Sequence, residues 1–562
     1  MAEAPPKAQV PRPAATLILL RPAASSTAAG PEVLMLKRTQ NAAFLGGAYV
    51  FPGGSLDPLD ADPRMLARVR GLTDERASRR LGIAGGALPY FVAAVRECFE
   101  EAGVALLHDS SGKLISRNHA EDLQAHRKSS FLEMLESENL FIPGDALAYY
   151  GHWITAPGRA RRFDTRFFVA QAPEGQEGSH DANETVHHMW VSPREALARG
   201  ERGEIELVFA TQTSLRDLGR FDAPRAAFEY AAALLEIDTN RACRAIGRDG
   251  ERIFRRADPQ YFEIHWTDPE ETGTTGYEIV PGIPKRLDRL VTRLTAPNPG
   301  AMTGPGTNTY LVGERDLAVI DPGPDIPSHI EKIVEAGQGR IRWIICTHTH
   351  FDHSPAAAPL KAATGAQVFG RPAPEGQDQT FKPDVIVEHG QRIQLGEMSD
   401  GVTLRAIRTP GHASNHVCYY LEQTKMLFTG DHVMQGSTVV INPPDGDMRA
   451  YLASLEALLA EDIAIIAPAH GYLIGEPHRE VRRLVAHRLA RESKVRTALA
   501  DIGPAPLEAL VPVVYDDVPE RMHRWAVRSL TAHLEKLVAE GAVRASGGRF
   551  ALVQSSSQGR SG

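Results

Sequence analysis

A multidomain protein of mixed α/β and α+β class is predicted by three features of the sequence. The chain has 562 residues, which is enough for three or four domains of ordinary size. Hydrophobic residues make up 43% of the chain and charged residues 23%, the balance of a soluble globular protein. Short apolar runs that read as strands alternate with helical patterns, and several of these runs end at a glycine turn that carries His or Asp.

Cysteine usage favours a reducing compartment. The four cysteines (Cys98, Cys243, Cys346 and Cys418) are scattered and form no CxxC pair, so no disulfide framework is expected. The first apolar run, residues 14–20, is too short to span a membrane. Because the sequence offers no other transmembrane segment, we expect a cytoplasmic protein without a membrane partner.

The charge of the chain is unevenly distributed. It is −8 overall, but residues 481–562 hold thirteen Lys and Arg against eight Asp and Glu. A basic tail on an acidic chain fits an anionic partner such as nucleic acid, and it equally fits a solvated helical surface.

Residues 13–240 are expected to form the first domain. Strand patterns cover residues 16–19, 32–38, 48–51, 152–155 and 165–170, and Pro52-Gly53-Gly54 predicts a turn after the third of them. A long insert follows, and residues 90–102 then predict one helix that ends at Gly103.

Three carboxylates crowd one side of that predicted helix. Glu97, Glu100 and Glu101 have spacings at which like charges repel, so the helix gains no stability from them. A hard cation such as Mg²⁺ or Mn²⁺ would turn this repulsion into a binding site. The alternative is an exposed acidic helix.

Two segments of this domain resemble the Nudix family: Phe51-Pro52-Gly53-Gly54 and Arg96-Glu97-Cys98-Phe99-Glu100-Glu101-Ala102-Gly103-Val104. The resemblance implies an α/β/α sandwich in which Glu97, Glu100 and Glu101 bind the metal and Glu100 and Glu101 take part in catalysis. It also implies hydrolysis of a small nucleoside diphosphate derivative. The long insert is similar to that of the coenzyme A diphosphatase branch, so a coenzyme A-type substrate is a further candidate.

One position departs from the Nudix pattern. The family's motif opens with a glycine fourteen residues before the arginine and a glutamate six residues after that glycine, and these positions here are Gly82 and Leu88. By this count the first glutamate is missing. The alternative to a Nudix enzyme is therefore a catalytically silent domain that binds a ligand or RNA.

Residues 241–282 are polar and contain two turn signals, residues 247–250 and 272–276. We expect a linker or seam there, followed by a domain over residues 283–480. In that domain, residues 309–313 and 317–323 predict a hairpin that ends in the acidic glycine turn Asp321-Pro322-Gly323.

The most specific motif of the chain is Cys346-Thr347-His348-Thr349-His350-Phe351-Asp352-His353-Ser354. Three histidines and an aspartate in six residues cannot all be satisfied in a core, and they are ligands that Zn²⁺ selects. Residues 341–346 predict a buried strand before the motif. After it, Ser354-Pro355 predicts the N-cap of a helix and Gly365 its end. The ligands would then lie where open α/β sheets place their sites, at a strand's C-terminal end.

Three later segments repeat the pattern of a His or Asp directly after an apolar run: Pro410-Gly411-His412, Gly430-Asp431 and Pro468-Ala469-His470-Gly471. With the first motif they resemble the metallo-β-lactamase superfamily, which implies an αββα sandwich with a dinuclear site at one edge. The resemblance implies one zinc ion on His348, His350 and His412, a second on Asp352, His353 and His470, and Asp431 as the bridge. Asp352 is also the expected acceptor of the proton that leaves the metal-bound water.

The substrate of the second domain stays open between two classes. Residues 301–312 and 443–448 resemble the β-lactamase-like protein 2 group, whose animal member is an endoribonuclease, so RNA phosphodiesters are one candidate. Thioesters and esters are the other, because glyoxalase II-like enzymes share the ligand set. Asp447 is expected to cap a helix over residues 448–460.

Residues 481–553 predict three helices and a hairpin, the order of a winged helix, which follows the catalytic domain in the same family. Five arginines could contact RNA phosphates there: Arg521, Arg524, Arg528, Arg544 and Arg549. The alternative is a domain that shapes the substrate cleft or an oligomer contact. Residues 554–562 are expected to be a disordered tail.

Overall fold

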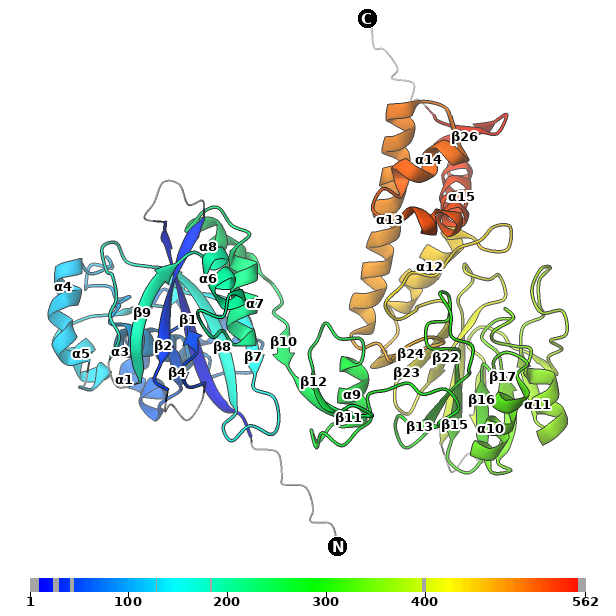
Figure 1. Ribbon diagram of the computed structural model, residues 1–562, viewed down its shortest axis with the longest axis horizontal. Helices are drawn as coiled ribbons and strands as arrows, with labels where there is room; N and C mark the ends of the chain where they lie inside the picture. The colour runs from blue at the N-terminus through cyan, green and yellow to red at the C-terminus, as the bar shows by residue number, and fades with distance from the viewer. Residues whose placement is uncertain are drawn as a thin grey trace, which may run out of the picture. The chain divides into compact units, whose positions relative to one another are not determined.

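The computed structural model describes residues 10–23, 30–40, 45–127, 129–181, 184–396 and 401–553, and the predicted disordered tail lies outside these ranges. The chain divides into two compact units between Arg244 and Ala245, and Figure 1 shows the elements of each unit. None of the helices in the described ranges combines the length and apolarity that a membrane span requires.

One eight-stranded sheet forms the centre of the first unit. Its strand order is β10-β7-β8-β1-β2-β3, with β4 paired to β1 and β9 paired to β2. These strands are β1 (Arg12–Pro22), β2 (Pro31–Arg38), β3 (Tyr49–Val50), β4 (Gly53–Ser55), β7 (Ala148–Ile154), β8 (Phe163–Gln171), β9 (Thr185–Val191) and β10 (Thr239–Arg241). The predicted strands are confirmed. The predicted glycine turn is wrong, because Gly53 and Gly54 belong to β4 and pair with β1.

Helices cover both faces of this sheet because side chains alternate along its strands. Leu17 and Leu19 of β1 belong to one core cluster with α3. Ile18 and Leu20 belong to another with α6, α7 and α8. The helices are α1 (Pro63–Leu66), α2 (Asp74–Leu81), α3 (Leu88–Ala102), α4 (Arg117–Asp122), α5 (Phe131–Ser137), α6 (Pro193–Glu201), α7 (Phe209–Leu218) and α8 (Pro224–Ala233); β5 (Val69–Arg70) pairs with β6 (Ile142–Pro143). The predicted α/β/α sandwich is confirmed.

Two sheets face each other in the second unit. The first runs β13-β14-β15-β16-β17-β18-β19 and the second β20-β21-β22-β23-β24. The strands are β13 (Lys285–Arg286), β14 (Val291–Thr295), β15 (Asn308–Gly313), β16 (Leu317–Ile320), β17 (Ile341–Ile345), β18 (Gln367–Gly370), β19 (Val385–Ile386), β20 (Arg392–Leu395), β21 (Val402–Arg408), β22 (Val417–Leu421), β23 (Met426–Gly430) and β24 (Ile465–Pro468). Tyr310 and Phe428, one from each sheet, share the core between them, with ring centroids 5.0 Å apart.

Helices complete a four-layer αββα sandwich. On one outer face, α10 (Pro327–Gly337) and α11 (Ala357–Thr364) pack against the first sheet. On the other, α12 (Met448–Leu458) and the start of α13 (Pro477–Ile502) pack against the second. The predicted sandwich is confirmed, as is the Asp447 cap, whose side chain accepts a hydrogen bond from the amide of Ala450.

The predicted start of α11 is wrong, whereas its end at Gly365 is confirmed. The helix begins at Ala357, without a side-chain cap. The hydroxyl of Ser354 donates instead to the buried carboxylate of Asp378 at 2.7 Å, and this contact directs the side chain to a tertiary partner.

Residues 245–282 pack as part of the second unit. They contain most of the hairpin β11 (Cys243–Gly247) and β12 (Gly250–Phe254), and the helix α9 (Tyr261–Thr267). Glu263 of α9 is fully buried and accepts hydrogen bonds from Arg293 at 2.5 and 2.9 Å and from Lys285 at 2.6 Å. It also accepts from the amide of Leu473 at 3.1 Å. This helix therefore supports the segment that follows β24.

The C-terminal elements form a small winged helix on one end of α13. They are β25 (Ala505–Pro506), α14 (Leu507–Val514), α15 (His523–Ala539), β26 (Val543–Ser546) and β27 (Arg549–Leu552). The helix α13 belongs to two cores: Val481 and Leu484 pack with the sandwich, and Val495 and Leu499 with the winged helix. The predicted winged helix is confirmed.

Candidate metal centres

Polar side chains gather at one edge of the αββα sandwich, where several strands end. His348, His350, Asp352 and His353 follow β17 directly. His412 follows β21, Asp431 follows β23 and His470 follows β24. All seven predicted ligands come together there, in two groups whose ligand atoms lie within 4.8 Å of one another.

The first group is made of three imidazoles and a carboxylate. His350 Nδ1 lies 2.9 Å from His348 Nε2 and 3.0 Å from His412 Nε2. Asp431 Oδ2 lies 3.6 Å from His412 Nε2. Burial, with the neighbouring His412, lowers the pKa of His350 to about 4, and burial also lowers the pKa of His348 well below its ordinary value. These rings are therefore neutral, the form that binds a metal.

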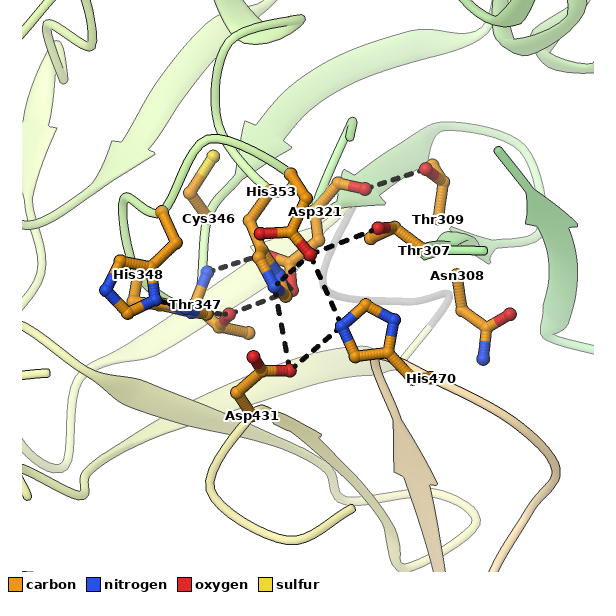
Figure 2. A network of polar contacts seen from close by, with 12 residues as sticks. Thr307, Asn308, Thr309, Asp321, Cys346, Thr347, His348, His353, Asp431 and His470 are labelled. Atoms are coloured by element: carbon orange, nitrogen blue, oxygen red, sulfur yellow. Dashed lines mark hydrogen bonds and ion pairs between the residues drawn. The ribbon is translucent and has the colours of Figure 1, made fainter. Parts of the chain in front are cut away.

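The second group holds two imidazoles and the carboxylate of Asp352, and Asp431 of the first group lies beside it, as Figure 2 shows in part. Asp352 Oδ2 lies 3.4 Å from Nε2 of both His353 and His470. Asp431 Oδ1 lies 3.2 Å from His470 Nε2 and 3.6 Å from His353 Nε2. Burial opposes protonation of His470, but the two carboxylates prevail and raise its pKa to about 9. Asp431 thus reaches both groups, one with each oxygen.

The opposite ring nitrogens are oriented by the surrounding protein. In four histidines the Nδ1 atom contacts an oxygen atom of the protein. The Nδ1 atoms of His348 and His353 lie 3.0 Å from Thr347 Oγ1 and 3.1 Å from Asp321 Oδ2, respectively. Those of His412 and His470 lie 2.8 Å from the carbonyl oxygen of Val440 and 3.3 Å from that of Gly306. This leaves Nε2 of each ring directed into the cluster. His353 Nε2 and Asp431 Oδ1 are buried there without a hydrogen-bond partner. Convergent, desolvated nitrogen and carboxylate donors fit divalent metal ions, and such outer contacts are typical of metal-binding histidines.

Asp321 also belongs to the candidate site, although its sequence signal is only that of a residue in a glycine turn. It is buried at the end of β16 and accepts hydrogen bonds from the amide and hydroxyl of Thr347, at 2.7 and 2.8 Å. It also contacts His353 at 3.1 Å, as Figure 2 shows. One carboxylate therefore orients His348, through Thr347, and His353 directly. The available signal was its position, because Asp321 follows a strand at a glycine turn as Asp431 does.

We expect Asp321→Asn to weaken metal binding by about 10- to 100-fold, since residues that orient metal ligands have effects of this size. The affinity for Zn²⁺ would be measured by competition with a chromogenic chelator. Asp316→Asn is the matched control, because Asp316 is paired with Arg342 on the surface instead. Equal affinities of the two variants would contradict the role given to Asp321.

The three glutamates of the first unit lie on the last turns of α3. Arg96 Nη1 donates to Glu97 and to Glu100, both at 2.9 Å, and Glu101 accepts from the amide of Gly53 at 3.0 Å. Burial raises the pKa of Glu97 to about 7 and that of Glu101 to about 8. Within the described residues, these glutamates do not reach the mutual 4.8 Å convergence of the other two groups.

The predicted arginine surface of the winged helix is exposed. Arg521, Arg524, Arg528, Arg544 and Arg549 all lie on the outside of the domain. The guanidinium of Arg524 stacks 3.8 Å from the centroid of the Trp525 ring.

Three family models match separate parts of the chain. The model described as NUDT19 Nudix domain matches residues 11–210, the Metallo-beta-lactamase superfamily model residues 302–470, and the Beta-lactamase associated winged helix domain model residues 507–550. They follow one another in the order of the structural elements described above.

Three curated relatives match about half of the chain each. "Thioesterase pkgB" of Emericella nidulans is 32% identical over 244 residues, 43% of this chain and 68% of that protein. "Beta-lactamase-like protein 2 homolog" of Drosophila melanogaster is 31% identical over 282 residues, 48% and 94%. "Atrochrysone carboxyl ACP thioesterase" of Aspergillus chevalieri is 31% identical over 288 residues, 49% and 88%. The chain therefore belongs to the metallo-β-lactamase superfamily of hydrolases, with a Nudix domain before its catalytic fold and the associated winged helix after it.

Proposed function

We propose that the second unit is a dizinc hydrolase that cleaves a thioester of the acyl-coenzyme A kind, and that the Nudix domain is a Mg²⁺- or Mn²⁺-dependent diphosphohydrolase. The observation that carries the first part is the geometry of the seven ligand atoms. They form two groups, and Asp431 of the first lies 3.2 Å from His470 and 3.6 Å from His353 of the second. The Nδ1 atoms of His353, His412 and His470 already contact oxygen atoms of the protein.

The chemistry of the dinuclear centre follows from its donors. Zinc ions bound there would supply hydroxide near neutral pH and polarise the carbonyl oxygen of the substrate. Asp352 is the residue that takes the proton from the attacking water. Its side chain is 29% exposed, unlike those of the other ligands of its group, and its Oδ2 accepts a hydrogen bond from Thr307 at 3.4 Å. The carboxylate of Asp352 would hold the proton before it passes to the leaving thiolate.

Two observations support a thioester substrate. Two of the relatives that match the second unit carry the name thioesterase. The chain also joins this unit to a Nudix domain, whose resemblance to coenzyme A diphosphatases suggests a substrate with a coenzyme A-type moiety.

RNA is the second candidate substrate of the dinuclear centre. The exposed arginines of the winged helix favour it, because they could neutralise phosphates beside the catalytic domain. The stacked pair of Arg524 and Trp525 could also meet an unpaired base. A separate alternative is a catalytically silent Nudix domain that serves as a ligand- or RNA-binding module for a glyoxalase II-like thioesterase.

The purified full-length protein would be tested on acyl-coenzyme A, coenzyme A, a lactoylglutathione-type thioester, single-stranded RNA and a β-lactam. We expect release of thiol from acyl-coenzyme A that is lost in Asp431→Ala and kept in Glu100→Gln. Cleavage of the diphosphate of coenzyme A should show the reverse pattern. Metal-dependent RNA cleavage without thioester turnover would overturn the proposal for the second unit. If Glu100→Gln retains both thioester hydrolysis and diphosphate cleavage, the proposal for the Nudix domain is overturned.

A further inference from the structure

A cavity of about 190 Å³ lies at the end of the αββα sandwich opposite the candidate dinuclear centre. Thr292, Gly313 and Leu317 line it, which places it where β14 and β16 begin and β15 ends. The candidate metal centre is built at the other ends of the strands, since Asp321 follows β16 and His348 follows β17. The length of the sheet therefore separates the cavity from the dinuclear centre.

Arginines dominate the walls of this cavity. Arg286 of β13, Arg289 of the turn before β14 and Arg340, which precedes β17, all line it. Within the described part of the chain, Glu314 is the one acidic residue of the lining. Three arginines and one glutamate give the lining a formal charge of +2. Guanidinium groups gathered in this way repel one another, and a bound anion would relieve that repulsion.

Backbone carbonyls hold two of these arginines without neutralising their charge. Arg286 donates from Nε and Nη2 to the carbonyls of Asp288 and Arg289, at 3.0 and 3.1 Å. Arg340 donates from Nη1 to the carbonyl of Glu314 at 2.8 Å. The Nε of Arg340 is buried and has no hydrogen-bond partner among the described residues. A buried donor left unpaired is unfavourable, so an oxygen atom of a ligand would stabilise it.

The carboxylate of Glu314 is a weak competitor for such a ligand. It accepts a hydrogen bond from Arg289 Nη1 at 3.3 Å. The side chain of Glu314 is 58% exposed and that of Arg289 66%. Exposed ion pairs of this kind contribute little, because water solvates both partners. An anion of higher charge can therefore replace Glu314 as the partner of Arg289.

The rest of the lining limits the size of the ligand. Leu311, Leu317 and Ala336 provide apolar surface, and Thr292 provides a hydroxyl group. Thr292 and Leu311 are partners in the register of β14 and β15, so their side chains lie on one face of the sheet. The volume of about 190 Å³ is below the about 300–1,000 Å³ of sites for drug-sized ligands. The cavity thus suits a small molecule with one charged group.

We propose that this cavity binds the phosphate group of a small phosphomonoester, with Arg286, Arg289 and Arg340 as its donors. Guanidinium groups match the oxygen atoms of phosphate in geometry and form charge-assisted hydrogen bonds with them. A phosphate ester carries about −1.5 to −2 charges at pH 7, which balances the charge of the lining, whereas a carboxylate carries one. The lining shares no residue with either proposed catalytic centre, so the ligand is distinct from their substrates.

Calorimetric titration of the full-length protein with glycerol 3-phosphate tests the proposal. We expect saturable binding that Arg340→Gln and Arg286→Gln each weaken by about 10- to 100-fold, the effect of losing a hydrogen bond to a charged group. Binding should persist in Asp431→Ala, which separates the cavity from the dinuclear centre. Inorganic phosphate should compete for the site, whereas acetate and glycerol should not.

Arg392→Gln is the matched control, because Arg392 lies on the second sheet and pairs there with Glu422 at 2.8 Å. Equal weakening in Arg392→Gln would overturn the proposal, since it would show unspecific attraction of an anion. Absence of binding to the unaltered protein, binding lost in Asp431→Ala, or equal competition by acetate would also overturn it. If circular dichroism shows that Arg340→Gln and Arg286→Gln do not fold, Arg289→Gln decides. Its side chain is exposed, and unchanged binding in this variant overturns the proposal.

Discussion

Asp431→Ala is expected to abolish hydrolysis at the dinuclear centre and to lower its zinc content. Asp431 reaches both groups, with Oδ2 3.6 Å from His412 Nε2 and Oδ1 3.2 Å from His470 Nε2. Its loss removes a donor from each side and leaves Asp352 as the remaining carboxylate of the cluster. The decrease in kcat/KM should exceed the about 10- to 100-fold decrease seen when a residue only orients a ligand.

Zinc content by plasma mass spectrometry and thioester hydrolysis would be measured on the same preparations. Asp462→Ala is the matched control, because Asp462 is an exposed aspartate that pairs with Lys425 on the surface. It should keep both the metal and the activity. Full activity of Asp431→Ala, or of a metal-free preparation of the unaltered protein, would disprove the assignment of the centre.

Glu263→Gln is expected to destabilise the second unit by about 3–5 kcal/mol, the usual effect of breaking a buried ion pair. Glu263 and Arg293 are both fully buried, and Lys285 adds a second positive charge to the same carboxylate. The substitution therefore leaves two cations without a counter-charge. Urea unfolding, followed by hydrogen exchange of peptides from β14 and α9, would measure the change. Glu314→Gln, which breaks an exposed pair with Arg289, should change the stability by less than about 1 kcal/mol.

The same ion pair predicts a pH dependence of stability. Burial alone would raise the pKa of Glu263, but Arg293 and Lys285 lower it from 4.5 to about 2. A carboxyl group with a lowered pKa in the folded state stabilises that state above its unfolded value, and the contribution is lost as the pH falls toward 2. The unfolding free energy should therefore decrease below about pH 4.5, and this part of the decrease should be absent in Glu263→Gln. If the unfolding free energies of the unaltered protein and of Glu263→Gln depend on pH in the same way, this role of Glu263 is contradicted.

The sequence was sufficient to identify the seven residues that gather at the candidate dinuclear centre, because their signals are local. His348, His350, Asp352 and His353 occupy one loop, and each of the other ligands directly follows its own strand. The role of Asp321 could not be predicted in the same way. It depends on the parallel pairing of β16 with β17, which places Asp321 beside Thr347, 26 residues further along the chain.

A tertiary contact also accounts for the predicted helix cap that failed. Ser354 matches a helix cap by local propensity, but its hydroxyl donates to Asp378 instead. This partner lies 24 residues further along the chain and close in space, which a local cap signal cannot express.

The helix α13 connects the core of the winged helix to the support of His412, one of the candidate metal ligands. Within the sandwich, Arg488 of α13 donates to the carbonyl of Val439, and the next carbonyl, that of Val440, orients His412. Since the far end of the same helix is part of the winged-helix core, a ligand that moved this end would also move the support of His412. By thermodynamic reciprocity, metal binding at His412 would then change the affinity of the winged helix for that ligand. Allosteric control of the hydrolase by its C-terminal domain would need no contact between that ligand and the metal centre.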